Sequence, residues 1–380
     1  MTGREKVAAA FSSDGTPEIA VVVPYEELYI RDNWPRLTSC PWWQRKDPSI
    51  ERQMEWRQEV RKYMRHDWFP VPWFYSTGER QVLRVHSRDD GVFLVDARTG
   101  RETRMEPPQV GGWGSSGEVA SFRPTSPPVT REDVYRLVAG IPRVEVPNIE
   151  WRGSDDLARA ILAGYGKDLY PISQVSSPLW SCYGLWGFEG MMAMIVENPD
   201  LVEYACGRFL RDAAQQVQAA ASLGAEAIWI EECLTDQISP ESFRRLNAPV
   251  MSDLVAEIRV AGLKSIYCFC GNPAGKWDHI LSIGADALAL EEGKKGFSID
   301  IADVAELVCG RCALLGNLDA IGVLQNGTEE QLRAEIARQI TAGRKNGSRF
   351  IMSVGSPVTP GTSPERFGLY CDLAHELGAR

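Results

Sequence analysis

The sequence predicts an α/β protein that folds as a (β/α)8 TIM barrel, with an N-terminal extension that contains a β-hairpin. Strand-like and helix-like segments alternate from about residue 129 onward, a pattern typical of a parallel sheet. The strand-like segments are short apolar runs, as expected for strands that are buried on both faces. The chain has 380 residues, enough for a barrel of about 250 residues and further elements. A doubly wound sheet is the alternative.

Residues 1–128 are predicted to form the N-terminal extension, which packs on the barrel and supplies its first elements. Alternating residues on both sides of a turn at 88–91 predict a hairpin over residues 80–105. Residues 106–128 are rich in proline, glycine and serine, and we expect a long surface loop or lid there. The other expected elements are a helix over residues 4–11, a strand over 19–25 and a helix over 47–66.

Residues 129–380 are predicted to form the main part of the barrel. Several helix starts are marked by a capping residue followed by proline, as at Ser239-Pro240 and Ser363-Pro364. The expected strands cover residues 170–175, 227–232, 264–270, 287–292, 313–319 and 349–355.

Composition narrows the class of protein. The formal net charge of −10 argues against a nucleic-acid partner, which would favour a basic face. No apolar run approaches the ~20 residues that a membrane helix needs, and we expect a cytoplasmic protein with no membrane partner. In a reducing compartment the nine cysteines are expected to be core residues, metal ligands or nucleophiles. Neither the glycine-rich dinucleotide fingerprint nor the P-loop is present.

Polar residues gather where the predicted strands end, which is the end of a barrel that carries the chemistry. Strand alternation places Cys268 and Cys270 on one face, and thiols are soft ligands that suit zinc. We expect zinc on these two thiols and one carboxylate, from Glu231 or Glu232 by preference and from Glu291 second, with the fourth position open for substrate. Two small apolar side chains in a buried strand, and solvated or salt-bridged glutamates, are the alternatives. The candidate catalytic residues are Glu231, Glu232 and Asn317, and Ser353 is a candidate substrate contact.

The N-terminal part of the chain is rich in tryptophan, which either packs the core or offers flat apolar walls to a ligand. His66 lies in this aromatic region, and we expect it to reach the barrel mouth as a substrate-binding residue. Packing on the protein surface or in the core is the alternative for this histidine.

A series of short motifs in the second half of the chain resembles the uroporphyrinogen decarboxylase superfamily. The motifs follow one another in the order and spacing of that superfamily, from about Pro171 to the C-terminus. They are Ser176-Ser177-Pro178-Leu179-Trp180 and residues 187–189, 198–202, 224–227, 238–243, 268–272, 284–287, 316–319, 327–328 and 362–365. The resemblance implies a substrate loop that contains Trp180, Tyr183 and Trp186, for which helix packing is the alternative.

The superfamily has two branches that differ in their motifs. Tetrapyrrole decarboxylases carry an arginine-rich N-terminal segment for the acetate groups of the substrate, and residues 31–34 do not match it. Methyl-corrinoid methyltransferases carry His-x-Cys-Gly after one strand and a later cysteine, which together bind zinc. Here Cys270-Gly271-Asn272 matches, Cys268 stands in place of the histidine and Ser356 in place of the late cysteine.

The resemblance to the second branch implies a corrinoid-dependent methyltransferase with zinc as Lewis acid. It moves a methyl group between a small methylated substrate and a corrinoid (cobalamin) that a separate partner protein carries, since the chain lacks the Asp-x-His-x-x-Gly signature. A methoxylated aromatic, a methylamine or a methylated betaine fits, and the aromatic-rich N-terminal part favours an aryl methyl ether. A metal-free decarboxylase and a non-catalytic ligand-binding barrel are the alternatives, and a homodimer is left open.

Overall fold

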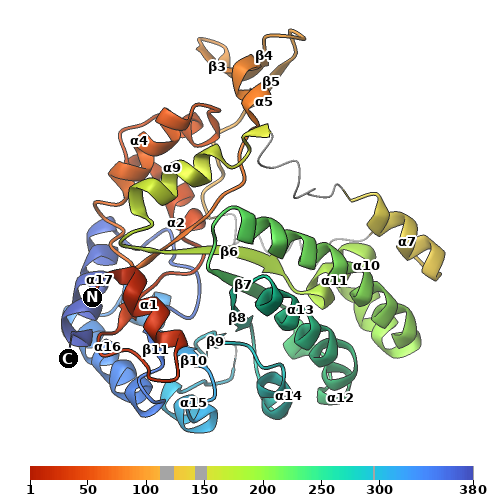
Figure 1. The fold of residues 1–380 in the computed structure, drawn as a ribbon, viewed down its shortest axis with the longest axis vertical. Helices are drawn as coiled ribbons and strands as arrows, with labels where there is room; N and C mark the ends of the chain where they lie inside the picture. The colour runs from red at the N-terminus through yellow and green to blue at the C-terminus, as the bar shows by residue number, and fades with distance from the viewer. Residues whose placement is uncertain (112–123, 142–151, 294–295, 380) are drawn as a thin grey trace.

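A curled sheet of eight parallel strands forms the centre of the computed structural model (Figure 1). The structure describes residues 1–111, 124–141, 152–293 and 296–379. The strand order is β1-β11-β10-β9-β8-β7-β6-β2, so that each strand from β6 to β11 lies beside its neighbour in sequence. This sheet, with helices around it, confirms the expected α/β class and has a TIM-barrel-like fold.

The six strands that we predicted after residue 129 are all present, and each begins within one residue of its expected start. The first two strands of the sheet come from the N-terminal region. The strands are β1 (Ala20–Val21), β2 (Trp68–Pro70), β6 (Tyr170–Ser176), β7 (Ala227–Glu232), β8 (Lys264–Phe269), β9 (Ala287–Leu290), β10 (Ala313–Leu315) and β11 (Phe350–Met352).

Asp67 connects the two edge strands of the curled sheet. Its main-chain N–H donates to the carbonyl oxygen of Val21 over 2.7 Å, and its Oδ2 accepts from the Val21 N–H, also over 2.7 Å. The indole of Trp68 donates to the Val23 carbonyl over 3.0 Å. Because Val21 pairs with β11 on its other side, these bonds close the sheet around its interior.

The sheet separates two hydrophobic layers. Side chains inside it include many small residues and two tryptophans, with Val7, Ala10 and Phe11 of α1 (Gly3–Phe11) packed against them at the amino ends of the strands. Side chains outside it pack on the surrounding helices. The other longer helices are α4 (Ile50–Val60), α7 (Arg131–Ala139), α9 (Asp156–Tyr165), α10 (Pro178–Glu197), α11 (Pro199–Ser222), α13 (Ala248–Val260), α15 (Ile301–Val308), α16 (Glu329–Lys345) and α17 (Pro364–Gly378).

Several helix starts have side-chain caps, among them the two expected at Ser239 and Ser363. Asn198, Ser239, Thr328 and Ser363 each accept a hydrogen bond from a main-chain N–H of the first turn. Such a cap satisfies a donor that has no partner within the helix, and it is worth about 1 kcal/mol. The caps therefore fix where each of these helices begins.

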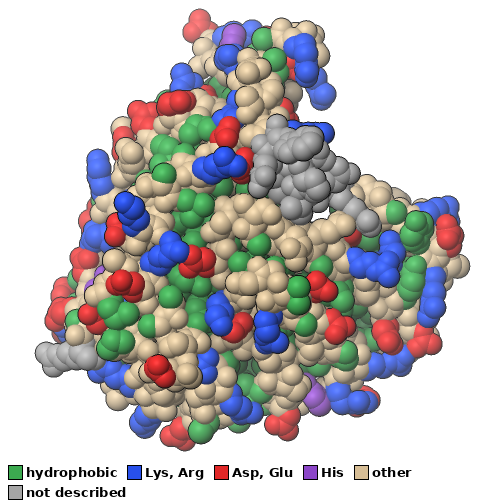
Figure 2. All heavy atoms as spheres, viewed as in Figure 1, with side chains coloured by type: hydrophobic (Ala, Val, Ile, Leu, Met, Phe, Trp, Pro, Cys, Tyr) green, Lys and Arg blue, Asp and Glu red, His purple; other side chains and the backbone are tan. Residues whose placement is uncertain are grey.

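A small antiparallel sheet stands apart from the central sheet, at the top of Figure 1. It consists of β3 (Leu83–Arg88), β4 (Gly91–Asp96) and β5 (Glu102–Met105), with β3 and β4 paired from Arg88–Gly91 to Leu83–Asp96. Of the predicted loop at 106–128, residues 112–123 lie outside the described part of the chain. Within the described residues, no helix has both the length and the apolar character to cross a bilayer. On the face shown in Figure 2, basic and acidic side chains are interspersed.

Candidate functional site

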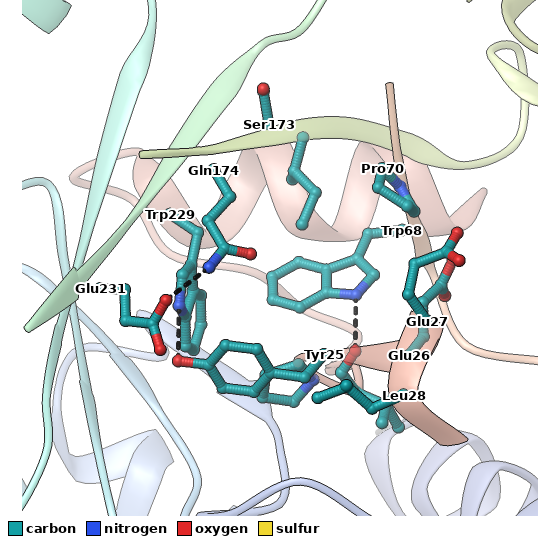
Figure 3. A pocket seen from close by; sticks show the side chains of 13 residues that line it. Tyr25, Glu26, Glu27, Leu28, Trp68, Pro70, Ser173, Gln174, Trp229 and Glu231 are labelled. Atoms are coloured by element: carbon teal, nitrogen blue, oxygen red, sulfur yellow. Dashed lines mark hydrogen bonds between the residues drawn. The ribbon is translucent and has the colours of Figure 1, made fainter. Parts of the chain in front are cut away.

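A cavity of about 350 Å³ opens at the carboxyl ends of β1, β2, β6 and β7 (Figure 3). This is the end of the strands at which TIM barrels carry their active sites. Its walls come from the segment after β1, from β2, from the middle of β6 and from β7. The lining residues are Val23, Pro24, Tyr25, Glu26, Glu27, Leu28, Trp68, Pro70, Ile172, Ser173, Gln174, Trp229 and Glu231.

Strand alternation decides which glutamate of β7 reaches the cavity. Trp229 and Glu231 are two residues apart and both line it, whereas Glu232 points to the other face of the sheet. There Glu232 is buried and accepts a hydrogen bond from the Ser177 hydroxyl over 2.7 Å. Burial raises the pKa of Glu232 to about 8. Of the two predicted glutamates, the structure therefore favours Glu231 as the one that can meet a ligand.

Three aromatic side chains form a corner in the cavity (Figure 3). The rings of Tyr25 and Trp229 meet at 82° with centroids 5.7 Å apart, and those of Trp68 and Trp229 at 88° and 5.9 Å. The Trp229 indole donates to the Tyr25 hydroxyl over 3.2 Å. Tyr25 has a left-handed backbone with φ of 57°, just before α2 (Glu26–Asp32) begins. These contacts fix the rings as walls that face in different directions.

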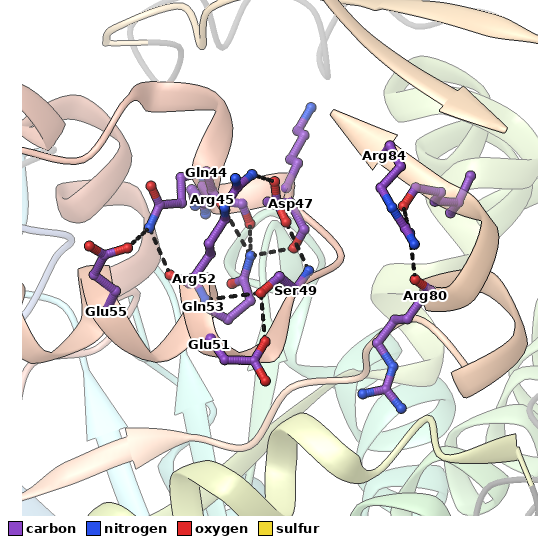
Figure 4. Close-up of polar contacts among 12 residues, drawn as sticks. Gln44, Arg45, Asp47, Ser49, Glu51, Arg52, Gln53, Glu55, Arg80 and Arg84 are labelled. Atoms are coloured by element: carbon purple, nitrogen blue, oxygen red, sulfur yellow. Dashed lines mark hydrogen bonds and ion pairs between the residues drawn. The ribbon is translucent and has the colours of Figure 1, made fainter. Parts of the chain in front are cut away.

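Two of the three glutamates in the cavity wall have cationic partners. Glu27 pairs with Arg45 over 2.8 Å. Arg45 lies in a segment that Gln53 of α4 holds, because the Gln53 amide donates to the main-chain carbonyls of that segment (Figure 4). Glu26 bonds to His66 over 2.6 Å and attracts the buried Arg61 electrostatically.

Glu231 has a different environment from the other two. Its Oε2 accepts from the Gln174 amide over 2.8 Å, and the Cys233 thiol faces its Oε1 over 3.7 Å. Among the described residues, no lysine, arginine or histidine forms an ion pair with Glu231. Burial raises the pKa of this carboxyl, and its hydrogen bonds oppose that rise.

A row of three thiols begins beside Glu231, and we call it the thiol row. The Sγ atoms of Cys233 and Cys270 are 3.5 Å apart, and those of Cys270 and Cys268 are 3.9 Å apart. The Tyr25 hydroxyl lies 3.9 Å from the Cys268 sulfur. The expected shared face of Cys268 and Cys270 is thus confirmed. The hydrogen bond to Cys270 and burial raise the pKa of the Cys233 thiol.

The thiol row has the donor chemistry for a soft metal, but its atoms are not arranged as a ready site. Within the described part of the chain, no group of three or more histidine, cysteine, aspartate or glutamate side chains is placed to hold a metal ion. The expected set of Cys268, Cys270 and a carboxylate therefore does not converge here. A zinc ion would need side chains of the row to move.

The other predicted metal and catalytic residues lie beyond the thiol row. Glu291 accepts from the Gly271 N–H over 3.1 Å, which ties it to the loop after β8. The Asn317 amide donates to the Ile299 carbonyl over 2.9 Å, and the Ser353 hydroxyl donates to the Val354 carbonyl over 3.0 Å. The structure gives Asn317 and Ser353 main-chain partners and places neither in the cavity wall.

The predicted substrate-binding residues do not line the cavity. His66 is buried behind Glu26, where burial lowers its pKa, so it reaches the cavity only through that glutamate. Trp180, Tyr183 and Trp186 lie on α10, and the Trp186 indole donates to the Pro128 carbonyl over 2.9 Å. Helix packing, the alternative for these aromatic residues, agrees with their location.

Sequence reasoning missed four residues of the site. It did not assign Cys233, Tyr25, Gln174 or Trp229 to the site. For Cys233 a signal exists, since it follows Glu231 by two residues and shares its face. Tyr25 had no signal, because its place depends on the closure of β1 against β2.

The fold and the cavity together define a TIM-barrel-like protein with a ligand site at the carboxyl ends of its strands. The family model of uroporphyrinogen decarboxylase (URO-D) matches residues 121–377. The chain belongs to the uroporphyrinogen decarboxylase family, as its motifs suggested.

Similar proteins include curated relatives and a solved structure. Uroporphyrinogen decarboxylase of Pseudomonas putida (strain GB-1) is 26% identical over 196 residues, which are 51% of this chain and 53% of the relative. The chain thus spans about half the length of this relative. The enzyme of Xanthomonas euvesicatoria pv. vesicatoria (strain 85-10) is 26% identical over 64% of this chain and 72% of its own. The structure of a methyltransferase from Methanosarcina mazei covers 99% of both chains at a TM-score of 0.67 and 16% identity, which shows a shared fold.

Proposed function

We propose that this protein is a methyltransferase that moves a methyl group between a small methylated compound and a corrinoid carried by a partner protein. The observation that carries the proposal is the charge of the cavity. Its described lining contains three glutamates and no lysine or arginine. A polycarboxylate substrate would meet repulsion there, whereas a neutral or cationic methylated compound would not.

The size and the neighbours of the cavity agree with this function. A volume of about 350 Å³ lies near the lower end of the range of about 300–1,000 Å³ for small-molecule sites, which favours a small substrate. The thiol row begins beside Glu231 in the cavity wall, so one carboxylate separates a substrate there from the soft sulfur ligands. The shared fold with the methyltransferase from Methanosarcina mazei supports the same assignment by analogy.

In this proposal, the cysteines of the thiol row would hold a zinc ion. When bound, it would supply Lewis acidity and hold its ligands as thiolates. The roles that we propose for the side chains of the cavity do not depend on zinc. The aromatic corner and Pro70 hold the apolar part of the substrate and exclude water, and Glu231 with Gln174 orients its polar part.

Decarboxylation of a tetrapyrrole is the second candidate, because the curated relatives carry that name. One experiment separates the two functions. The purified protein is incubated anaerobically with cob(I)alamin and, in turn, a methylated amine, a methylated betaine and an aryl methyl ether, and the visible spectrum reports methylcobalamin. A parallel sample receives uroporphyrinogen, and released carbon dioxide is measured.

We expect methylcobalamin with at least one donor and no carbon dioxide above the protein-free control. Carbon dioxide release without any methylcobalamin would establish the decarboxylase and overturn the proposal. Absence of both products would overturn the proposal as well and favour a binding barrel without turnover.

A further inference from the structure

Of the three glutamates in the described wall of the cavity, Glu231 has no cationic partner among the described residues. Glu27 has Arg45, and Glu26 has the buried Arg61 nearby. Within the described residues, Glu231 has the Gln174 amide, the Cys233 thiol and the Tyr25 hydroxyl as its polar neighbours, and none of them carries a positive charge. An ionised Glu231 therefore leaves a negative charge in a partly buried wall, which is unfavourable until a cation binds there.

The remaining wall is aromatic. The Trp229 ring meets the rings of Tyr25 and Trp68 edge to face, at 82° and 88°, so the three rings face in different directions around the cavity that they line. Aromatic faces attract cations through their quadrupole, and tryptophan does so most strongly. Quaternary ammonium groups suit such walls, because their charge is spread over methyl groups that also favour apolar contact.

We propose that this cavity binds a compact methylated ammonium cation, with the three aromatic side chains around its methyl groups and Glu231 as its counter-ion. The same carboxylate contacts the thiol row through Cys233, so that Glu231 belongs to the cavity wall and also adjoins the sulfur atoms. This inference names the substrate class of the proposed methyltransferase and rests on that function only for the transfer step. The aryl methyl ether that the sequence favoured would leave Glu231 without a counter-charge.

Binding can be tested without any transfer. Choline and 3,3-dimethyl-1-butanol have nearly the same shape, but a carbon replaces the charged nitrogen in the second compound. Calorimetric titration of the wild-type protein is expected to give saturable binding of choline and of tetramethylammonium. The uncharged alcohol is expected to bind at least tenfold more weakly. Equal binding of choline and the alcohol, or no binding of either cation, would overturn the inference.

Two variants test the counter-ion. The substitution Glu231→Gln keeps the size of the side chain and removes its charge, and we expect choline binding at least tenfold weaker. Glu257→Gln removes an exposed charge on α13 and is expected to bind choline as the wild type does. Thermal unfolding checks that both variants fold. Unchanged binding by a folded Glu231→Gln protein would contradict the assignment of Glu231.

Cation binding by the cavity and methyl transfer to cob(I)alamin can be disproved independently of each other. Saturable cation binding without methylcobalamin formation would leave the cation site standing and remove the transfer step. Methylcobalamin formed from an uncharged donor, with no binding of choline or tetramethylammonium, would leave the transfer standing and overturn the cation site.

Discussion

The Sγ atom of Cys233 lies 3.5 Å from that of Cys270, and the Cys233 thiol faces Glu231 of the cavity wall. A second close pair of thiols, Cys182 and Cys206, has its sulfur atoms 3.7 Å apart, but it is buried between α10 and α11. The two pairs have similar geometry and different surroundings. Because the first pair contacts Glu231 of the cavity wall and the second pair is packed between helices, the second pair is a matched control for every test of the thiol row.

The first prediction concerns metal binding by the thiol row. Protein purified without chelators is expected to hold zinc in a stoichiometric amount, measured by mass spectrometry. The double variant Cys233→Ala, Cys270→Ala is expected to lose most of that zinc, because two soft ligands are removed. The control variant Cys182→Ala, Cys206→Ala should keep it. Equal zinc content in both double variants would show that the metal lies elsewhere.

The second prediction concerns the pH dependence of stability. Burial raises the pKa of Glu232 to about 8 from an unfolded value near 4.5, so between these values the folded protein binds more protons than the unfolded chain. This group therefore lowers the free energy of unfolding as the pH rises from about 5 to 8, by on the order of a few kcal/mol. Glu232→Gln removes that loss.

Denaturant unfolding of both proteins at several pH values measures this effect. The advantage of Glu232→Gln over the wild type should grow up to about pH 8 and stay constant above it. A difference that does not change with pH would mean that Glu232 titrates normally in the folded protein.

The third prediction concerns Asp67, which closes the sheet. Asp67→Ala leaves the Val21 N–H without its acceptor and removes the contact of His375 with this carboxylate. A buried donor without a partner costs about 1–3 kcal/mol, so we expect a loss of that order in the free energy of unfolding. Asp372→Ala, which breaks the exposed pair with Arg65, should change it by less than about 1 kcal/mol. Similar losses in both variants would argue against the closing role of Asp67.

The fourth prediction concerns helix packing on the sheet. A Cβ atom at Gly343 of α16 would lie 2.1 Å from the Cγ of Phe350 in β11, and both residues are buried. Gly343→Ala is expected to destabilise the protein by about 1–3 kcal/mol through overpacking. Gly207 of α11 is exposed with no atom near an added Cβ, so Gly207→Ala should stabilise by about 0.5–1 kcal/mol. If the melting temperatures of both variants shifted in the same direction, the result would contradict this prediction.

Much of the fold could be predicted from the sequence, because apolar strands and helix caps are local signals. The strand ends were less accurate. The strands predicted over residues 287–292 and 313–319 end earlier, at Leu290 in β9 and at Leu315 in β10. Asn317 therefore lies outside β10, and its amide bonds to the Ile299 carbonyl. The closing contact of Asp67 with β1 could not be predicted, since it joins residues 46 apart through a side chain.

Less of the site could be predicted. The shared face of Cys268 and Cys270 follows from strand alternation, and the same rule separates Glu231 from Glu232. The location of His66 did not follow, because its partner Glu26 belongs to a helix that starts after a left-handed residue. Tyr25 and Trp229 come into contact only when the sheet closes, so no local sequence pattern predicts their contact.

The rate of methyl transfer to cob(I)alamin in the two cysteine double variants tests the proposed methyltransferase function most directly. We predict that the wild type forms methylcobalamin from a methylated donor and that Cys182→Ala, Cys206→Ala keeps this rate. The variant Cys233→Ala, Cys270→Ala is predicted to lose about 10–100-fold, because it lacks the ligands beside the cavity. A wild-type protein that forms no methylcobalamin, or a thiol-row variant as fast as the wild type, would contradict the account.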